Sequence, residues 1–254
     1  MNLYFKKFGD SPSHLIILHG LLGSSDNWQT IAKNLSGKFS VYVLDARNHG
    51  RSPHDNVMTY ELMVIDLLHF MLQEKIDKAT LIGHSMGGKT AMLFALNYPE
   101  KTDKLIVVDI APKQYDGGHE EILFAMAEAP LQVTQDRKDI DVFLQKRIPD
   151  FGIRQFILKN LTRDEYGKLV WRSNVEGIIH AYRGLMGFPN VETVFDGETY
   201  FIKGEESDYL LENDEAAIRY LFPNASIIAI PKAGHWVHAD QPELFLQTIN
   251  LLLK

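Results

Sequence analysis

The sequence contains no cysteine, no long basic run and no apolar stretch long enough to cross a bilayer. Without cysteine the chain cannot form disulfides, thiolate metal sites or a cysteine nucleophile. Lys and Arg number 26 against 33 Asp and Glu, a formal charge of -7, so nucleic acid is not an expected partner. The first residues lack the apolar segment of a signal peptide, and no membrane association is expected. We therefore expect a cytoplasmic protein.

Short apolar runs alternate with segments of helical periodicity, which is typical of parallel strands joined by crossover helices. The expected strands, most of them rich in Ile, Val and Leu, are 14–19, 41–44, 79–83, 104–108, 200–203 and 226–230, with 3–8 as an antiparallel edge. The expected helices of this repeating pattern are 60–74, 86–97, 215–222 and 242–253. The predicted fold class is α/β, with a mostly parallel central sheet and helices on both faces.

The alternation of strands and helices stops after residue 112 and resumes near residue 199. The residues between are helical in character and contain no convincing strand, with short amphipathic helices expected at 122–129, 140–147, 154–160 and 175–186. The sequence therefore predicts one core, residues 1–112 and 199–254, and a helical cap, residues 113–198, inserted after the sixth strand. The apolar faces of the cap helices are expected to cover a pocket.

The strongest motif is the segment G-H-S-M-G-G at residues 83–88, which lies between an apolar run and a helical segment. This is the G-x-S-x-G pattern in its strand-turn-helix context. Such a turn strains the serine backbone and closes only between small neighbours, which explains Gly83 and Gly87. The helix that follows presents a partial positive charge to a developing oxyanion. Ser85 is the predicted nucleophile, and the alternative is a serine in a purely structural turn.

With this motif the chain resembles the α/β-hydrolase family over nearly its whole length. The loop L-H-G-L-L-G at residues 18–23 matches the family segment that gives one main-chain amide to the oxyanion hole. The resemblance implies that Leu21 and Met86, the residue after the nucleophile, supply the two amides.

The segment D-A-R-N-H-G-R-S at residues 45–52 resembles the family pattern D-x-R-G-x-G-x-S, with Asn48 in place of a glycine. We expect the turn to survive because Asn tolerates the left-handed conformation better than other non-glycine residues. Asp45 is expected to have a scaffolding role, since it precedes the nucleophile in the chain and the acid of the family's triad follows it.

The expected general base is His235, in the segment A-G-H-W-V-H, where the resemblance places the family's histidine. An unperturbed histidine pKa of about 6.5 lets the side chain accept the serine proton and later protonate the leaving group. Among the ten histidines, His49, His84 and His238 also lie in or near matching motifs. Turn geometry is expected to direct His84 away from the nucleophile, and His238 lies one helical turn too late.

The acid of the triad has two candidates. The family usually takes it from a G-x-x-D pattern after the strand that precedes the histidine strand, but Ser207 occupies that position and Asp208 follows one residue late. The segment V-D-I-A-P offers Asp109 at the carboxyl end of an earlier strand. Together with the histidine segment it is similar to the bacterial YbfF-like esterases, in which the acid follows that earlier strand. The resemblance favours Asp109, with Asp208 as the alternative.

Candidates for the substrate pocket lie in the expected cap or beside the catalytic loops, and they are Leu21, Leu22, Trp28, Phe124, Trp171, His180, Tyr182 and Trp236. Arg154 and Arg183 in the cap are expected on solvated helix faces rather than against an acidic acyl group.

The motifs and the resemblance predict a serine hydrolase that cleaves small acyl esters or thioesters through an acyl-enzyme on Ser85. The alternatives are a carbon-carbon bond hydrolase or lyase with the same triad, and a small-molecule receptor with slow turnover. No metal ion or organic cofactor is expected, because the histidines are not spaced as a ligand set. The expected partner is the small-molecule ester or thioester, and the expected assembly is a monomer or homodimer.

Overall fold

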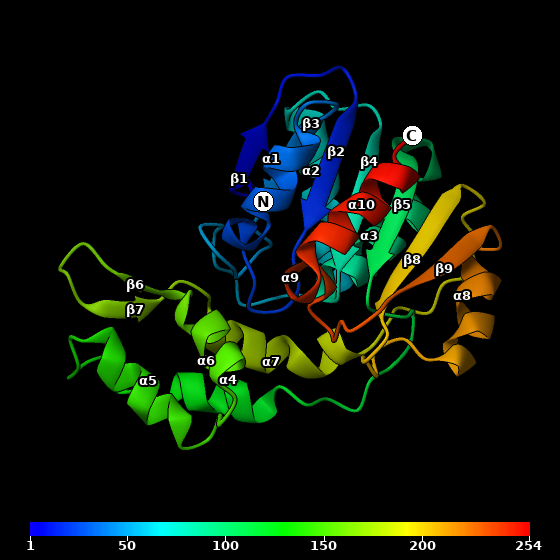
Figure 1. Ribbon diagram of the computed structural model, residues 1–254. Helices are drawn as coiled ribbons and strands as arrows, with labels where there is room; N and C mark the ends of the chain where they lie inside the picture. The colour runs from blue at the N-terminus through cyan, green and yellow to red at the C-terminus, as the bar shows by residue number, and fades with distance from the viewer.

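The computed structural model describes residues 1–254, and its centre is a seven-stranded sheet with helices on both faces (Figure 1). The strands, in the order of the sheet, are β1 (Phe5–Phe8), β3 (Ser40–Leu44), β2 (His14–Leu18), β4 (Ala79–His84), β5 (Thr102–Val108), β8 (Glu198–Gly204) and β9 (Ala225–Ile230). Within this sheet only the pairing of β1 with β3 is antiparallel. The predicted fold class is confirmed, including the antiparallel edge.

Alternate residues of the buried strands build a core on each face of the sheet, because successive strand side chains point to opposite sides. Ile16 and Leu18 belong to one core, and Leu15 and Ile17 belong to the other. The helices of the first face are α2 (Tyr60–Gln73), α3 (Met86–Asn97) and α8 (Glu215–Leu221). Those of the second face are α1 (Gln29–Leu35), α9 (Val237–Asp240) and α10 (Pro242–Leu252). The parallel strands therefore share one carboxyl edge, where α/β proteins place their ligand sites.

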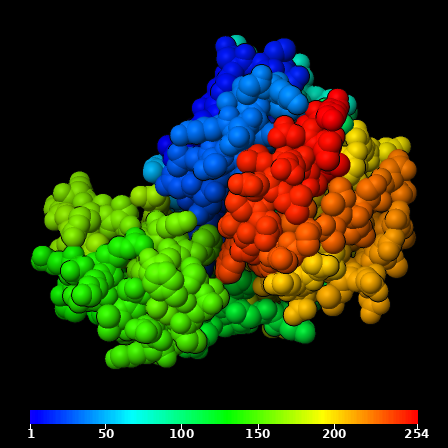
Figure 2. All heavy atoms as spheres, in the orientation of Figure 1, coloured from blue at the N-terminus to red at the C-terminus, as the bar shows by residue number.

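Between β5 and β8 the chain leaves the sheet and forms the cap, a lobe at one end of the core (green to yellow-green in Figure 1, and in spheres in Figure 2). Its elements are α4 (Glu120–Ala127), α5 (Arg137–Gln145), α6 (Phe151–Leu158), β6 (Leu161–Arg163), β7 (Leu169–Trp171) and α7 (Val175–Met186). Apolar residues of these helices continue the first core. The remaining short elements are the 3-10 turns Ser25–Trp28, Pro99–Lys101 and Glu212–Asp214.

Two details of the cap differ from the sequence prediction. The lobe follows the fifth strand of the chain and not the sixth, because five strands, β1 to β5, precede α4. The lobe is also not wholly helical, since β6 and β7 pair as an antiparallel hairpin. Strands of three residues are too short for an alternating pattern to show in the sequence. No helix of the chain combines the length and the apolar character that a membrane crossing requires.

Candidate active site

Ser85 lies in the turn between β4 and α3, with φ of 52° and ψ of -118°. A Cβ atom added at Gly83 would stand 2.3 Å from the carbonyl oxygen of Gly87, and one added at Gly87 would stand 2.3 Å from that of Leu18. Only glycine allows both approaches. The amide of Ser85 donates to the carbonyl oxygen of Val108 at 3.0 Å, so the neighbouring strand β5 holds the strained turn in place.

The amides of Leu21 and Met86 make no hydrogen bond within the protein. Both lie beside Ser85. A Cβ atom added at Gly20 would stand 3.2 Å from the Cβ of Ser85, and Met86 is the first residue of α3. Two free N–H groups, one from the loop after β2 and one from the first residue of α3, favour negative charge that develops on an oxygen near the hydroxyl. These are the two amides that the sequence predicted for an oxyanion hole.

Asp109 and His235 come from loops at the carboxyl ends of β5 and β9, and they meet. His235 Nδ1 donates to Asp109 Oδ2 at 2.8 Å. The carboxylate is fully buried, accepts the amide of Gly204 on Oδ1 at 2.8 Å and accepts the hydroxyl of Ser207 on Oδ2. This arrangement places the imidazole proton on Nδ1 and leaves Nε2 as a proton acceptor.

Asp208, the alternative acid, is exposed and does not contact His235. Its neighbour Ser207 is buried at 7% exposure and contacts Asp109 instead. Of the two candidate carboxylates, the structure therefore brings only Asp109 to the imidazole.

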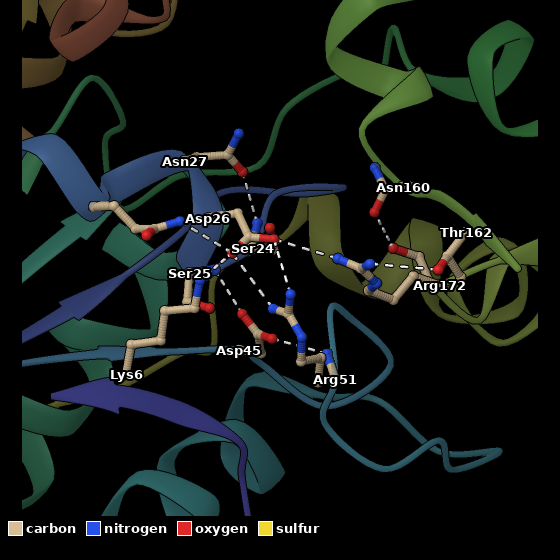
Figure 3. A network of polar contacts seen from close by, with 12 residues as sticks. Lys6, Ser24, Ser25, Asp26, Asn27, Asp45, Arg51, Asn160, Thr162 and Arg172 are labelled. Carbon is tan, nitrogen blue, oxygen red and sulfur yellow. Dashed lines mark hydrogen bonds and ion pairs between the residues drawn. The ribbon is translucent and has the colours of Figure 1, made fainter. Parts of the chain in front are cut away.

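Asp45 lies away from the imidazole and organises the loop that follows β3 (Figure 3). Its carboxylate accepts the amides of Ser25 and Arg51 at 2.5 and 2.8 Å. Asn48 in the same loop has φ of 63°, the left-handed conformation expected for the residue in the glycine position. These contacts are the scaffolding role expected of Asp45. In the same view Asp26 pairs with Lys6, Arg51 and, from the cap, Arg172.

His84 and His238 are two buried histidines near His235. His84 Nε2 donates to the main-chain oxygen of His235 at 2.9 Å, and the two rings are 4.7 Å apart. Burial, with the nearby His235 as a second cause, lowers the pKa of His84 well below its usual range. His238 stacks on Trp28 at 4.0 Å, and burial lowers its pKa to about 3. Both are thus neutral near pH 7 and support the loop of His235 without charge.

Ser85 and His235 line one cavity of about 260 Å³ between the core and the cap. Leu21, Leu22 and Trp236, which the sequence named as pocket candidates, line it too. The cap adds mainly apolar side chains, and the cap residues of the lining are Gly118, His119, Ile122, Ile153, Phe156 and Ile157. The cavity can therefore hold a small apolar substrate against the hydroxyl.

The remaining pocket candidates do not line this cavity. Phe124 is 47% exposed and His180 is exposed, because α4 and α7 turn other faces toward the site. Trp171 Nε1 donates to the main-chain oxygen of Met126 within the cap, and the Tyr182 hydroxyl accepts the amide of His119. Trp28 packs against His238 in the second core. Short helices with apolar residues on several sides do not reveal which face meets the site.

Sequence reasoning missed two residues near Ser85. Tyr209 stacks on the imidazole of His235, with ring centres 3.8 Å apart and an interplanar angle of 22°. No local motif marks it. Lys89 lies one helical turn after Ser85 and is 2% exposed. The sequence does single out Lys89, because it is the only charged residue in the helical segment that became α3.

Comparison with known proteins agrees with this geometry. A profile of the alpha/beta hydrolase fold matches residues 13–135. The sn-1-specific diacylglycerol lipase ABHD11 of Danio rerio is 39% identical over 265 residues, covering 100% of this chain and 83% of that protein. Esterase YbfF of Escherichia coli (strain K12) is 36% identical over 242 residues, covering 95% of this chain and 93% of that protein.

A solved structure described as a marine microorganism esterase has 42% sequence identity and a TM-score of 0.96, and the similarity covers 99% of both chains. The similarity to proteins named as esterases or lipases thus extends over the core, the cap and the site. The protein is a hydrolase of the esterase and lipase kind, and the chain belongs to the α/β-hydrolase family.

Proposed function

We propose that the protein is a serine esterase that cleaves small acyl esters or thioesters through an acyl-enzyme on Ser85. The observation that carries this proposal is the 2.8 Å hydrogen bond from His235 Nδ1 to Asp109, beside a cavity that Ser85 and His235 line together. The bond leaves Nε2 of His235 available to take the proton of the serine hydroxyl.

In the proposed reaction, Ser85 Oγ attacks the acyl carbonyl carbon while His235 accepts the hydroxyl proton. The amides of Leu21 and Met86 bind the oxyanion of the tetrahedral intermediate. The imidazolium, stabilised by the buried Asp109, then protonates the departing alcohol or thiol. Water, deprotonated by His235, attacks the acyl-enzyme and releases the carboxylic acid and the free serine.

Covalent labelling tests the nucleophile directly. A fluorophosphonate probe is expected to modify Ser85 stoichiometrically, as shown by peptide mass spectrometry, and an activated acetate ester is expected to turn over. Ser85→Ala should abolish labelling and hydrolysis with thermal stability unchanged, while Ser36→Ala, outside the cavity, should behave as wild type. Absence of both labelling and turnover in the wild-type protein would exclude the esterase.

A graded series of substrates tests the acyl group and the leaving group. Acyl chains of increasing length are compared as matched esters and thioesters, together with a diacylglycerol because the Danio rerio relative is named for that substrate. The mainly apolar cavity of about 260 Å³ leads us to expect the highest kcat/KM with short chains of both kinds. A maximum with the diacylglycerol would contradict the small-substrate proposal and leave the nucleophile unaffected.

A further inference from the structure

A second, smaller hollow of about 20 Å³ adjoins the active-site cavity at the nucleophile. Leu21, Ser85, His119 and Tyr209 line both hollows, which places their junction at Ser85. We call the smaller hollow the side branch. The residues that line only the side branch include Tyr60, Lys89, Ile110, Tyr115 and Leu185. The side branch therefore extends from Ser85 to a buried lysine.

The ammonium of Lys89 has main-chain and aromatic neighbours. Its Nζ donates to the carbonyl oxygens of Met186 and Gly187 at 2.8 and 2.6 Å, at the end of α7. It also lies 4.6 Å from the centre of the Tyr115 ring. An ammonium group has three N–H bonds, so one donor remains beyond these two hydrogen bonds.

No carboxylate pairs with Lys89. The neighbouring lysine, Lys113, lies over the same Tyr115 ring and is paired with Asp214, whose two oxygens are each 2.7 Å from it. Burying an ammonium without an opposite charge is unfavourable. Burial, and then the charge of Lys113, lowers the pKa of Lys89 to about 7. An anion in the side branch would supply the missing partner.

The position of His235 decides which part of a substrate enters the side branch. The imidazole must protonate the leaving alcohol or thiol, so the leaving group lies beside it. His235 lines the main cavity and does not line the side branch. With the carbonyl carbon at Ser85 and the leaving group in the main cavity, the acyl chain extends toward Lys89.

We propose that the terminal carboxylate of a short acyl chain enters the side branch, whose volume suits a group of this size and not the whole chain, with Lys89 as the counter-ion of that carboxylate. This inference rests on the esterase function proposed above. The substrates are half-esters or half-thioesters of short dicarboxylic acids, and their free carboxylate accepts the remaining N–H of Lys89. The cap arginines do not compete for it, since Arg154 pairs with Asp141 and Arg183 is exposed.

Two phenyl esters of equal chain length test the proposal, namely phenyl hemiglutarate and phenyl pentanoate, each corrected for uncatalysed hydrolysis. At pH 6.5 the wild-type protein is expected to favour the hemiglutarate in kcat/KM by roughly 10- to 100-fold, the factor given by a hydrogen bond to a charged group. Lys89→Met should lower this preference by about the same factor. Lys113→Met, the control at the neighbouring paired lysine, should keep it.

The outcomes separate the two proposals. Equal kcat/KM for both esters in the wild-type protein would overturn the role of Lys89 and leave the esterase in place. No hydrolysis of either ester, with no labelling of Ser85, would overturn both. An equal loss of preference in Lys89→Met and Lys113→Met would also contradict a specific ion pair.

Lys89→Met also removes two hydrogen bonds to the end of α7. Lys89→Gln, which retains donors for these carbonyl oxygens but no charge, is therefore measured beside it, with thermal unfolding of both variants. The proposal requires that Lys89→Gln loses the preference as well. The comparison of the two esters in the wild-type protein needs no variant, so it decides the question even if both variants fail to fold.

Discussion

The hydroxyl of Ser207 donates a hydrogen bond to the carboxylate of Asp109, on the same oxygen that accepts the His235 proton. Ser207 follows β8, where the family usually has its acid, and Asp109 follows β5. Because β5 and β8 are neighbouring parallel strands, their carboxyl ends lie side by side. The carboxylate at His235 thus comes from the loop after β5 and not from the loop after β8. Ser207, in the loop after β8, donates a hydrogen bond to that carboxylate.

Asp109→Asn is expected to lower kcat by a factor on the order of 10⁴, because an amide no longer selects the tautomer with the proton on Nδ1. Asp208→Asn serves as the matched control, since Asp208 is exposed and does not contact the imidazole. Steady-state kinetics of the two variants on one activated ester decide between them. The reverse ranking would reassign the acid.

Ser207→Ala is expected to lower kcat by roughly 10- to 100-fold with little change in KM, because the carboxylate of Asp109 loses one of its donors in a site without water access. The loss should be smaller than that of Asp109→Asn. Ser207→Thr retains the hydroxyl and should restore most of kcat. If the threonine variant were as slow as the alanine variant, a packing role for Ser207 would explain the result better.

Asn160 links the cap to the loop of the free Leu21 amide. Its Nδ2 donates to the carbonyl oxygen of Leu22 at 2.8 Å, and Leu22 has φ of 57°. Asn160→Leu leaves that buried oxygen without its donor, so we expect a loss of about 1–3 kcal/mol in the free energy of unfolding. We also expect a lower kcat.

Urea unfolding and ester hydrolysis measure the two effects of Asn160→Leu. Asn34→Leu, on the exposed side of α1, is the control, because Asn34 bonds only to its own helix. Wild-type kcat together with reduced stability in Asn160→Leu would show that the hydrogen bond to Leu22 stabilises the fold and does not position the Leu21 amide.

The buried, neutral His238 makes stability depend on pH. Its pKa of about 3 in the folded protein lies below the unfolded value of about 6.5, so below pH 6.5 only the unfolded chain takes up the proton. The free energy of unfolding therefore falls as the pH decreases from 6.5 toward 3, by up to about 1.4 kcal/mol per pH unit from this residue. Above pH 6.5 this contribution is constant.

His238→Phe removes this titration and keeps an aromatic ring against Trp28. Urea unfolding at pH 7 and pH 5 is expected to give a smaller difference for His238→Phe than for the wild-type protein. His180→Phe, at an exposed histidine, should show the wild-type difference. Equal differences for all three proteins would exclude His238 as a source of the pH dependence.

Patterns within single segments predicted most of the core. The helix expected at residues 86–97 is found as Met86–Asn97, and the strands that surround it lie where apolar runs indicated them. The turn at Ser85 was predictable because its small neighbours are adjacent in the chain. The cap was less predictable, since the hairpin of β6 and β7 has too few residues to show a period.

The sequence by itself determined the turn at Ser85, the loop of His235 and the α/β class, because each depends on residues that are close together in the chain. Only the tertiary structure decided which carboxylate faces His235, since Asp109 and Asp208 reach the same edge only when β5 and β8 pair. It also decided that Lys89 is buried without a carboxylate beside Ser85. A charge is recognised as unpaired only when every segment packed around it is in place.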